Sequence, residues 1–410
     1  MLTIEKAKQK LKKAKTVLYL DAHSNVKIPN LALMKLSYYL GLDYDYATSS
    51  TIKQLPAKKL FRDYDLIFCS CIYSYKYPSI VVQIHTKNWE GKTLIGGYGS
   101  PFDHTLEDII GTRADIYDYS LYPWFEPNIG FSQRGCRNKC EFCVVPKHEG
   151  RNRSVNSLMQ LMQKSTKKLV LLDNDFFGQK EWKEKCDFIL EEDLKISFNQ
   201  GINVRLLTEE QAEYLVKIKP YSYTFKSRLL NTAWDQQKDE KLFRKKIEML
   251  LGKGFNPKHI MVYMLIGFEQ QETFEDIWHR FWTIQKYGLF PYPMVYITCM
   301  SCEDQQNCDP STNYECPRRA MAKALIQFRE WVHVYAKDRF VKHNVGTTNE
   351  RDYYKDWVEY FQNHSESFPK EVVDFFTHSK FKGLKIEKAA KKRIRKKVKD
   401  SMVCLWDKGE

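Results

Sequence analysis

The sequence has no long apolar run and contains little glycine or proline. Its longest apolar run, Met261–Phe268, has the length of a strand and falls far short of the roughly 18–20 residues that cross a membrane. The N-terminus is lysine-rich and lacks the apolar segment of a secretory signal, so we expect a cytoplasmic protein without a membrane span. With only 18 glycines and 14 prolines in 410 residues, the chain is neither collagen-like nor low-complexity.

Positive charge exceeds negative charge, but only at the two ends of the chain. The net charge is +14, of which Met1–Lys15 contributes +5 and Lys380–Lys399 contributes +10. The intervening body, Thr16–Ser379, carries only +1. The excess at the ends suggests a polyanionic partner and says little about the body of the protein.

The eleven cysteines are unevenly distributed. In a reducing compartment they are not expected to form disulfides, and clustered cysteines are better explained as metal ligands. Two groups stand out, and four further cysteines are scattered. The first group is Cys136, Cys140 and Cys143; the second is Cys299, Cys302, Cys308 and Cys316; the scattered ones are Cys69, Cys71, Cys186 and Cys404.

The first 125 residues predict a parallel sheet of the Rossmann-like type. Apolar runs that are typical of strands alternate with a helical segment that has Pro29 near its start and Gly41 just past its end. Strands that alternate with helices favour a parallel α/β sheet. The strands are expected at Thr16–Leu20, Leu66–Ile72 and Thr93–Ile95.

Residues 126–298 repeat a strand–helix unit six times. Six units of roughly 30 residues are too few for a complete eight-stranded barrel, so the sequence predicts an open, partial (β/α) barrel. Strands are expected at Ile129–Gln133, Leu169–Leu172, Ile196–Asn199, Tyr221–Phe225, Ile260–Leu265 and Met294–Ile297. Helices are expected near Val155–Ser165, Trp182–Glu191, Glu209–Lys219, Lys241–Leu251 and Phe274–Tyr287. A cysteine-rich loop and helical extension (299–379) and a basic tail (380–410) complete the chain.

The segment Cys136-Arg-Asn-Lys-Cys140-Glu-Phe-Cys143 carries the strongest chemical signal. Three thiolates within eight residues, on a loop after a strand, can surround one soft metal centre. A 4Fe–4S cluster held by three cysteines leaves one iron open to a substrate or cofactor. The alternative is a zinc site, for which His148 is the nearby fourth ligand.

This C-x-x-x-C-x-x-C segment, with Phe142 before the third cysteine, resembles that of the radical S-adenosylmethionine (SAM) superfamily. The resemblance extends to about Ile297. Within the superfamily, the chain is similar to methylthiotransferase-like and cobalamin-type members. It implies that Cys136, Cys140 and Cys143 hold a 4Fe–4S cluster whose open iron binds SAM. An electron from a donor such as a flavodoxin or ferredoxin would then cleave SAM to a 5′-deoxyadenosyl radical, which abstracts hydrogen from the substrate.

The resemblance also implies cofactor-binding residues at the ends of the barrel strands. Phe142 would flank the adenine, and Asp173 or Asn174 would meet the SAM amino group. Asn203 and Arg205 follow the third strand and are further candidates for cofactor binding. Arg205 could bind a carboxylate of SAM or of the substrate, and it is the candidate catalytic residue. Gly267 and Glu269 resemble the Gly-x-x-Glu element near adenine.

The N-terminal domain resembles cobalamin-binding domains in part. Asp21-Ala-His23-Ser-Asn-Val26 is similar to their D-x-H-x-x-G loop, in which the histidine ligates cobalt, although Val26 replaces the glycine. Gly97 stands where that fold has a glycine pair. The alternative is a Rossmann-like domain that binds no cobalamin, with His23 as an ordinary loop residue.

The C-terminal features suggest a second metal site and a contact with nucleic acid. Cys299, Cys302, Cys308 and Cys316 could hold zinc or a second iron–sulfur cluster. Lys380–Lys399 is expected to form a basic helix with an apolar stripe at spacing four, which suits a polyanion. The alternative is a solvated terminal helix that aids solubility.

Three functional interpretations follow from these features. The first is a radical SAM enzyme that modifies a nucleic acid or nucleotide. The second is a cobalamin-dependent radical SAM methyltransferase for a small molecule or peptide, and the third a non-catalytic iron–sulfur protein that binds nucleic acid.

Overall fold

The structure, a computed structural model of the 410-residue chain, has an α/β fold. It describes all residues except 24, 55–62, 74–75, 103, 270, 297–316, 334–349, 365–367, 369 and 378–410. The chain divides into two compact units. Unit 1 is Met1–Ser132 with Val155–Val170, and unit 2 is Gln133–Ser154 with Leu171–Glu410. Throughout the described part of the chain, no helix combines the length and apolarity that crossing a bilayer requires.

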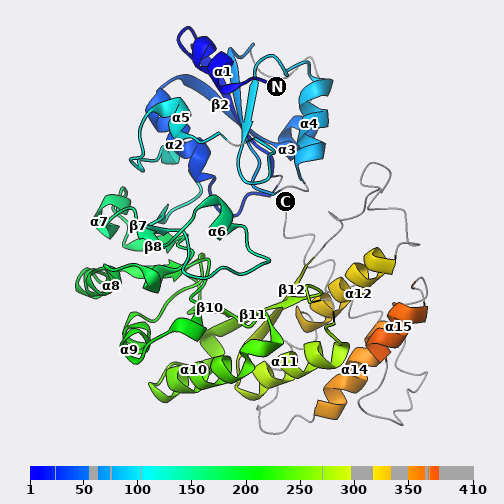
Figure 1. Ribbon diagram of the computed structural model, residues 1–410. Helices are drawn as coiled ribbons and strands as arrows, with labels where there is room; N and C mark the ends of the chain where they lie inside the picture. The colour runs from blue at the N-terminus through cyan, green and yellow to red at the C-terminus, as the bar shows by residue number, and fades with distance from the viewer. Residues whose placement is uncertain are drawn as a thin grey trace. The chain divides into compact units, whose positions relative to one another are not determined.

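Unit 1 contains a parallel four-stranded sheet with the order β2-β1-β3-β4. This confirms the Rossmann-like sheet that the sequence predicts. The strands are β1 (Thr16–Asp21), β2 (Asp43–Thr48), β3 (Leu66–Ser70) and β4 (Thr93–Gly96). Helices α1 (Ile4–Leu11), α2 (Leu31–Leu40) and α5 (Glu107–Ile110) lie on one face, and α3 (Ser49–Gln54) and α4 (Tyr77–Thr86) lie on the other (Figure 1).

Alternate residues of the central strands build the two cores of this sheet. Leu18, Leu20, Ile67 and Cys69 are buried in one apolar cluster, together with Ile80 and Ile84 of α4. Their neighbours Val17, Tyr19 and Phe68 are also buried, because a strand sheltered on both faces hides every residue. Cys69 and Cys71 belong to the α4 side and are small core residues.

The helix α2 begins and ends where its sequence predicts. The side chain of Asn30 accepts a hydrogen bond from the Leu33 amide at its start, next to Pro29. At its end Gly41 has a φ of +55°, a conformation that glycine adopts without strain. The sequence analysis did not predict β2. Two of its six residues are aspartates, which are uncommon in strands, and the strand lies at the edge of the sheet.

The six strands of the predicted partial barrel follow one another in two short sheets. One sheet has the order β5-β8-β9 and the other the order β10-β11-β12, whose pairs are parallel. The strands are β5 (Asn128–Gly130), β8 (Lys168–Leu171), β9 (Lys195–Phe198), β10 (Leu230–Ala233), β11 (Ile260–Ile266) and β12 (Phe290–Val295). The boundary between the units runs through β8.

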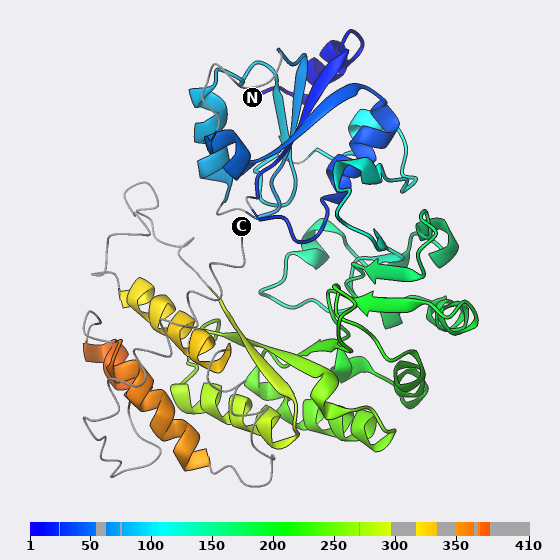
Figure 2. The ribbon, with the colours of Figure 1, turned by 180° about the vertical axis from the view of Figure 1, so that it is seen from behind.

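The helices of unit 2 lie in a row along its strands (Figures 1 and 2). Their bounds agree closely with the prediction. Two of their starts carry a strong local signal, because Thr208 and Thr273 form capping boxes before α9 and α11. The helices are α8 (Trp182–Glu191), α9 (Glu209–Ile218), α10 (Glu240–Gly252) and α11 (Phe274–Lys286); in unit 1, α7 covers only Leu158–Leu161.

The fourth predicted strand was wrong. Residues Tyr221–Phe225 form a tight turn, in which Phe225 has a φ of +58° and Tyr221 forms an isolated antiparallel bridge with Arg228. The Arg228 guanidinium lies 3.6 Å from the centre of the Tyr221 ring, so the aromatic residues that suggested a strand pack within the turn. The actual strand, β10, begins at the buried Leu230.

Three further helices complete unit 2 and confirm the helical extension. They are α12 (Pro317–Trp331), α14 (Glu350–Gln362) and α15 (Lys370–Thr377). Aromatic side chains join them to α11: Trp278 lies 5.9 Å from Trp331, and Phe274 lies 5.8 Å from Trp357 between ring centres. The cysteines of the predicted second metal site and the basic tail lie outside the described residues.

Candidate functional site

The three clustered cysteines lie on a partly exposed loop of unit 2 that follows β6 (Gln133–Arg134). The loop is followed by α6 (Val145–His148), and the antiparallel pairing of β6 with β7 (Arg153–Ser154) closes its base. Gly135 has a φ of +75°, and an added Cβ would lie 2.2 Å from the Arg151 carbonyl oxygen. Only glycine therefore allows the chain to turn into the loop at this point.

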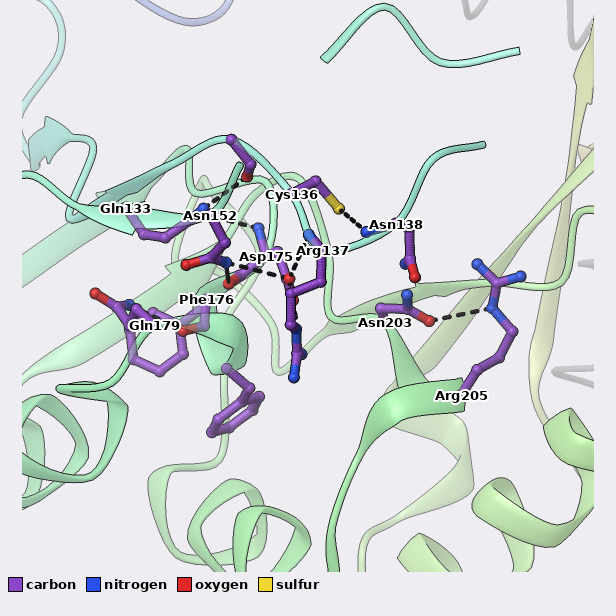
Figure 3. A network of polar contacts seen from close by, with 12 residues as sticks. Gln133, Cys136, Arg137, Asn138, Asn152, Asp175, Phe176, Gln179, Asn203 and Arg205 are labelled. Carbon is purple, nitrogen blue, oxygen red and sulfur yellow. Dashed lines mark hydrogen bonds and ion pairs between the residues drawn. The ribbon is translucent and has the colours of Figure 1, made fainter. Parts of the chain in front are cut away.

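A buried carboxylate, Asp175, anchors this loop. It accepts two hydrogen bonds from the Arg137 guanidinium, at 2.7 Å and 2.9 Å, and one from the Arg137 backbone amide at 3.2 Å. The side-chain amide of Asn152 also donates to it, at 3.1 Å, from the returning end of the loop. Figure 3 shows these side chains gathered on Asp175, so one carboxylate joins both ends of the cysteine loop.

A second layer of hydrogen bonds fixes Asp175 and its neighbours. The Asp175 amide donates to the Gln133 side chain at 2.9 Å, and the Gln133 amide donates to Asp173 at 3.1 Å. Asn174 donates to Glu149 at 2.8 Å, and Glu149 forms an ion pair with Arg134 at 3.0 Å. The predicted residues Asp173 and Asn174 therefore support the loop in this structure, and their contact with SAM stays a prediction.

The three thiols lie close enough to influence one another. Burial raises the pKa of Cys136, and Asp175, Cys140 and Cys143 raise it further, whereas the Asn138 amide, 3.4 Å from the sulfur, lowers it. Burial likewise raises the pKa of Cys143, with contributions from Cys140, Asp235 and Glu149. The sulfur of Cys136 points toward Asn138, on the side of the loop where Asn203 and Arg205 lie (Figure 3).

Two charged groups of opposite sign lie beside the thiols. Arg205, in the turn after β9, lies near Cys140. Burial lowers the pKa of Arg205, but Asp239 and Cys140 raise it more, so the pKa is raised and the cation is secured. Asp235 follows β10 and lies near Cys143 and Arg205; burial raises the pKa of this carboxyl.

The predicted cofactor residues after β9 form one connected group. Arg205 donates from Nε to the Asn203 side chain at 3.1 Å and forms an ion pair with Asp239. Its side chain is only 16% exposed, so the guanidinium is held in one place instead of moving in solvent. Sequence reasoning missed both Asp235 and Asp239, which follow a strand whose start it placed nine residues too early.

The end of β11 is organised by a buried ion pair that the sequence did not reveal. Gly267, which has a φ of +78°, donates its amide to Glu272 at 2.7 Å. Glu272 in turn forms an ion pair with the fully buried Arg280 of α11. Arg280 also donates to the carbonyls of Trp234, Asp235 and Leu265, at 3.1, 2.8 and 3.0 Å. This arginine therefore fixes the ends of β10 and β11 relative to each other.

Glu272, and not the predicted Glu269, is the carboxylate that caps Gly267. The amide of Glu272 donates to the Glu269 carbonyl at 3.1 Å, so Glu269 contributes its backbone to the same turn. The role of Glu269 toward a cofactor stays a prediction.

Phe142 lies in an aromatic row that joins the cysteine loop to two strand ends. Its ring centre is 5.4 Å from that of Phe268, after β11, and Phe268 is 4.9 Å from Tyr296, after β12. Edge-to-face contacts of this kind favour a defined ring position. Phe142 is thus held beside the thiols, where the resemblance places the adenine.

The donor set of the loop consists of three thiols. The backbone amide of Asn138 donates to the Cys136 sulfur at 3.4 Å, and Arg205 lies near Cys140. Cysteine thiolates are the usual ligands of iron–sulfur clusters, so these side chains fit such a group. Among the described residues, no three His, Cys, Asp or Glu side chains lie close enough together to hold a single metal ion.

In unit 1, His23 and Gly97 occupy different environments. His23 has an imidazole Nε2 that is buried and has no hydrogen-bond partner among the described residues, and its ring lies 4.9 Å from that of Tyr73. Gly97 has a φ of +100°, and an added Cβ would lie 2.5 Å from the Cys71 carbonyl oxygen. Packing against Cys71 is therefore sufficient to require glycine at position 97.

Comparison with solved structures gives a structural likeness, and the other comparisons give none. No protein-family model matches the chain, and no curated protein matches it. Among solved structures, the chain is similar to the apo, SeMet-labelled cobalamin-dependent S-adenosylmethionine radical enzyme OxsB. The sequence identity is 13% and the TM-score is 0.35, and the match covers 78% of this chain and 56% of that one. The chain thus spans about half the length of this enzyme.

We predict that Asp175→Asn loosens the cysteine loop without unfolding the protein. The substitution removes the charge that Arg137 and Asn152 share, so backbone amides in 136–152 should exchange hydrogen about tenfold faster or more, which corresponds to about 1.4 kcal/mol. Hydrogen exchange followed by mass spectrometry measures this. Asp193→Asn is the control, since Asp193 is exposed and its φ of +47° suits asparagine equally well. Equal exchange rates in the two variants would contradict the claim that Asp175 anchors the loop.

Proposed function

We propose that the chain is a radical SAM enzyme, in which Cys136, Cys140 and Cys143 hold a 4Fe–4S cluster. The observation that carries the proposal is the set of three mutually close thiols on one anchored loop, with Arg205 beside Cys140 and Asp235 beside Cys143. When bound, such a cluster supplies the electron that cleaves SAM to a 5′-deoxyadenosyl radical. The chain's own residues would position the cofactor.

The opposite charges of Arg205 and Asp235 fit the two ends of an amino acid. The methionine part of SAM carries a carboxylate and an ammonium group, which suit a guanidinium and a carboxylate respectively. Arg205 is fixed by Asn203 and Asp239, so it offers its remaining donors in a defined direction. Asp235 is the better ammonium partner than Asp173, because Asp173 is only 3% exposed and accepts the Gln133 amide.

The proposed substrate is a nucleic acid or nucleotide. The support for this is the +10 charge of Lys380–Lys399 on a chain whose body is nearly neutral. A basic segment of this kind binds phosphates without reading sequence. The reaction that follows hydrogen abstraction is a transfer or related radical modification of that substrate.

A cobalamin-dependent radical SAM methyltransferase is the second candidate. It is favoured by one observation, the buried Nε2 of His23 that has no partner among the described residues. An imidazole nitrogen in this state can ligate a metal such as cobalt. Cobalamin binding to the isolated protein, and its loss in His23→Ala, would favour this candidate.

We predict that Cys140→Ala abolishes both the iron content and the cleavage of SAM. Removing one of three thiolates leaves too few ligands to hold the cluster. Iron analysis after anaerobic reconstitution and detection of 5′-deoxyadenosine under reducing conditions measure the two effects. Cys186→Ala is the control, because this buried cysteine of α8 should retain wild-type values.

The same experiment separates the alternatives. Wild-type protein that binds iron at these cysteines but cleaves no SAM would favour a non-catalytic iron–sulfur protein. About four irons per chain would indicate one cluster, and about eight would indicate a second cluster at Cys299–Cys316. Full iron content in Cys140→Ala would contradict the cluster assignment.

We predict that deletion of 380–410 weakens nucleic acid binding and flattens its salt dependence. The deletion removes a net charge of about +8, so fewer phosphate counterions are released on binding. Fluorescence anisotropy with an RNA oligonucleotide at several salt concentrations measures the slope. The full-length chain provides the reference, and an unchanged slope would remove the support for a nucleic acid substrate.

A further inference from the structure

A cavity of about 390 Å³ lies directly behind the first cysteine of the loop. Cys136 lines it, together with Lys139 and Arg151, whose side chains are exposed and have no hydrogen bond or ion pair among the described residues. The remaining lining residues are Arg137, Asn138, Pro146, Gly150, Asn152 and Gly178. Asp175, which anchors the loop, binds the side chain of Arg137 but not those of Lys139 and Arg151.

Positive charge is concentrated in this part of unit 2. Residues 134–153 contain six lysines and arginines against two glutamates, whereas Thr16–Ser379 as a whole carries only +1. Two of the nearby acids face inward: Glu149 is 5% exposed and pairs with Arg134, and Asp175 is 3% exposed and pairs with Arg137. Glu141, the other glutamate of the segment, is exposed. The segment is cationic because its basic residues outnumber its glutamates six to two and because Glu149 is paired inside the loop.

This position suits the delivery of an electron. The cavity reaches the sulfur-bearing residue Cys136 from outside the loop, and its rim carries the unpaired cations. Complementary charge steers a protein partner to one patch and raises its association rate. A carrier with an acidic surface would be guided here, next to a cluster ligand.

We propose that Lys139, Arg151 and the cavity between them dock an acidic flavodoxin-class electron carrier. The proposal rests on the proposed function, since the docked carrier serves the cluster at Cys136, Cys140 and Cys143. In the step, the reduced carrier is oxidised by one electron and the cluster is reduced by the same electron. No bond forms or breaks, and no proton needs to move.

The test compares Lys139→Glu/Arg151→Glu with Lys241→Glu/Lys245→Glu. The control lysines are exposed residues of α10 and give the same charge change elsewhere on unit 2. Flavodoxin binding is measured by fluorescence titration at low salt, and SAM cleavage is measured with reduced flavodoxin and with dithionite. We expect the first variant alone to bind flavodoxin at least tenfold more weakly, and to lose flavodoxin-driven but not dithionite-driven cleavage.

The binding measurement keeps this proposal separate from the proposed function. If wild-type protein cleaves no SAM with dithionite, the proposed function fails, while a selective loss of binding still supports the docking surface. The neutral variant Lys139→Gln/Arg151→Gln should bind with intermediate strength. Equal binding by the two charge-reversed variants would overturn the proposal.

Discussion

The arrangement of the candidate site depends on one buried carboxylate, Asp175. A loop that carries three thiols and several cations has little apolar surface of its own to bury, so it needs polar contacts to keep one shape. Asp175 supplies them by binding Arg137 at the start of the loop and Asn152 at its end. A buried carboxylate is costly unless it is fully hydrogen-bonded, and here Arg137 meets that requirement while it fixes the loop.

Ion pairs with little exposure also hold the ends of the other strands near the site. Arg280 is fully buried and is paired with Glu272 through Nη2, and its Nη1 donates to three carbonyl groups at the ends of β10 and β11. Arg205 is held by Asn203 and Asp239. Charge pairs with little exposure therefore hold both Arg205 and the strand ends around it in place.

The sequence predicted the elements that have strong local signals. The starts of α9 and α11 were predicted correctly, and capping boxes at Thr208 and Thr273 fix them in the structure. The assignment of Cys136, Cys140 and Cys143 as cluster ligands stays a prediction. The strand at Tyr221–Phe225 was wrong, because its aromatic residues serve a turn stabilised by Arg228. Asp235 and Glu272 were missed, since their roles arise from burial and from partners far along the chain, which spacing does not encode.

The most direct test of the central claim is a titration of the reduced, reconstituted protein with SAM, followed by electron paramagnetic resonance. If the three cysteines hold a cluster with one open iron, the signal should change shape as SAM binds. In Asp235→Asn the same change should need at least about tenfold more SAM, which corresponds to about 1.4 kcal/mol of binding free energy. A signal that SAM leaves unchanged, in protein with full iron content, would contradict the account.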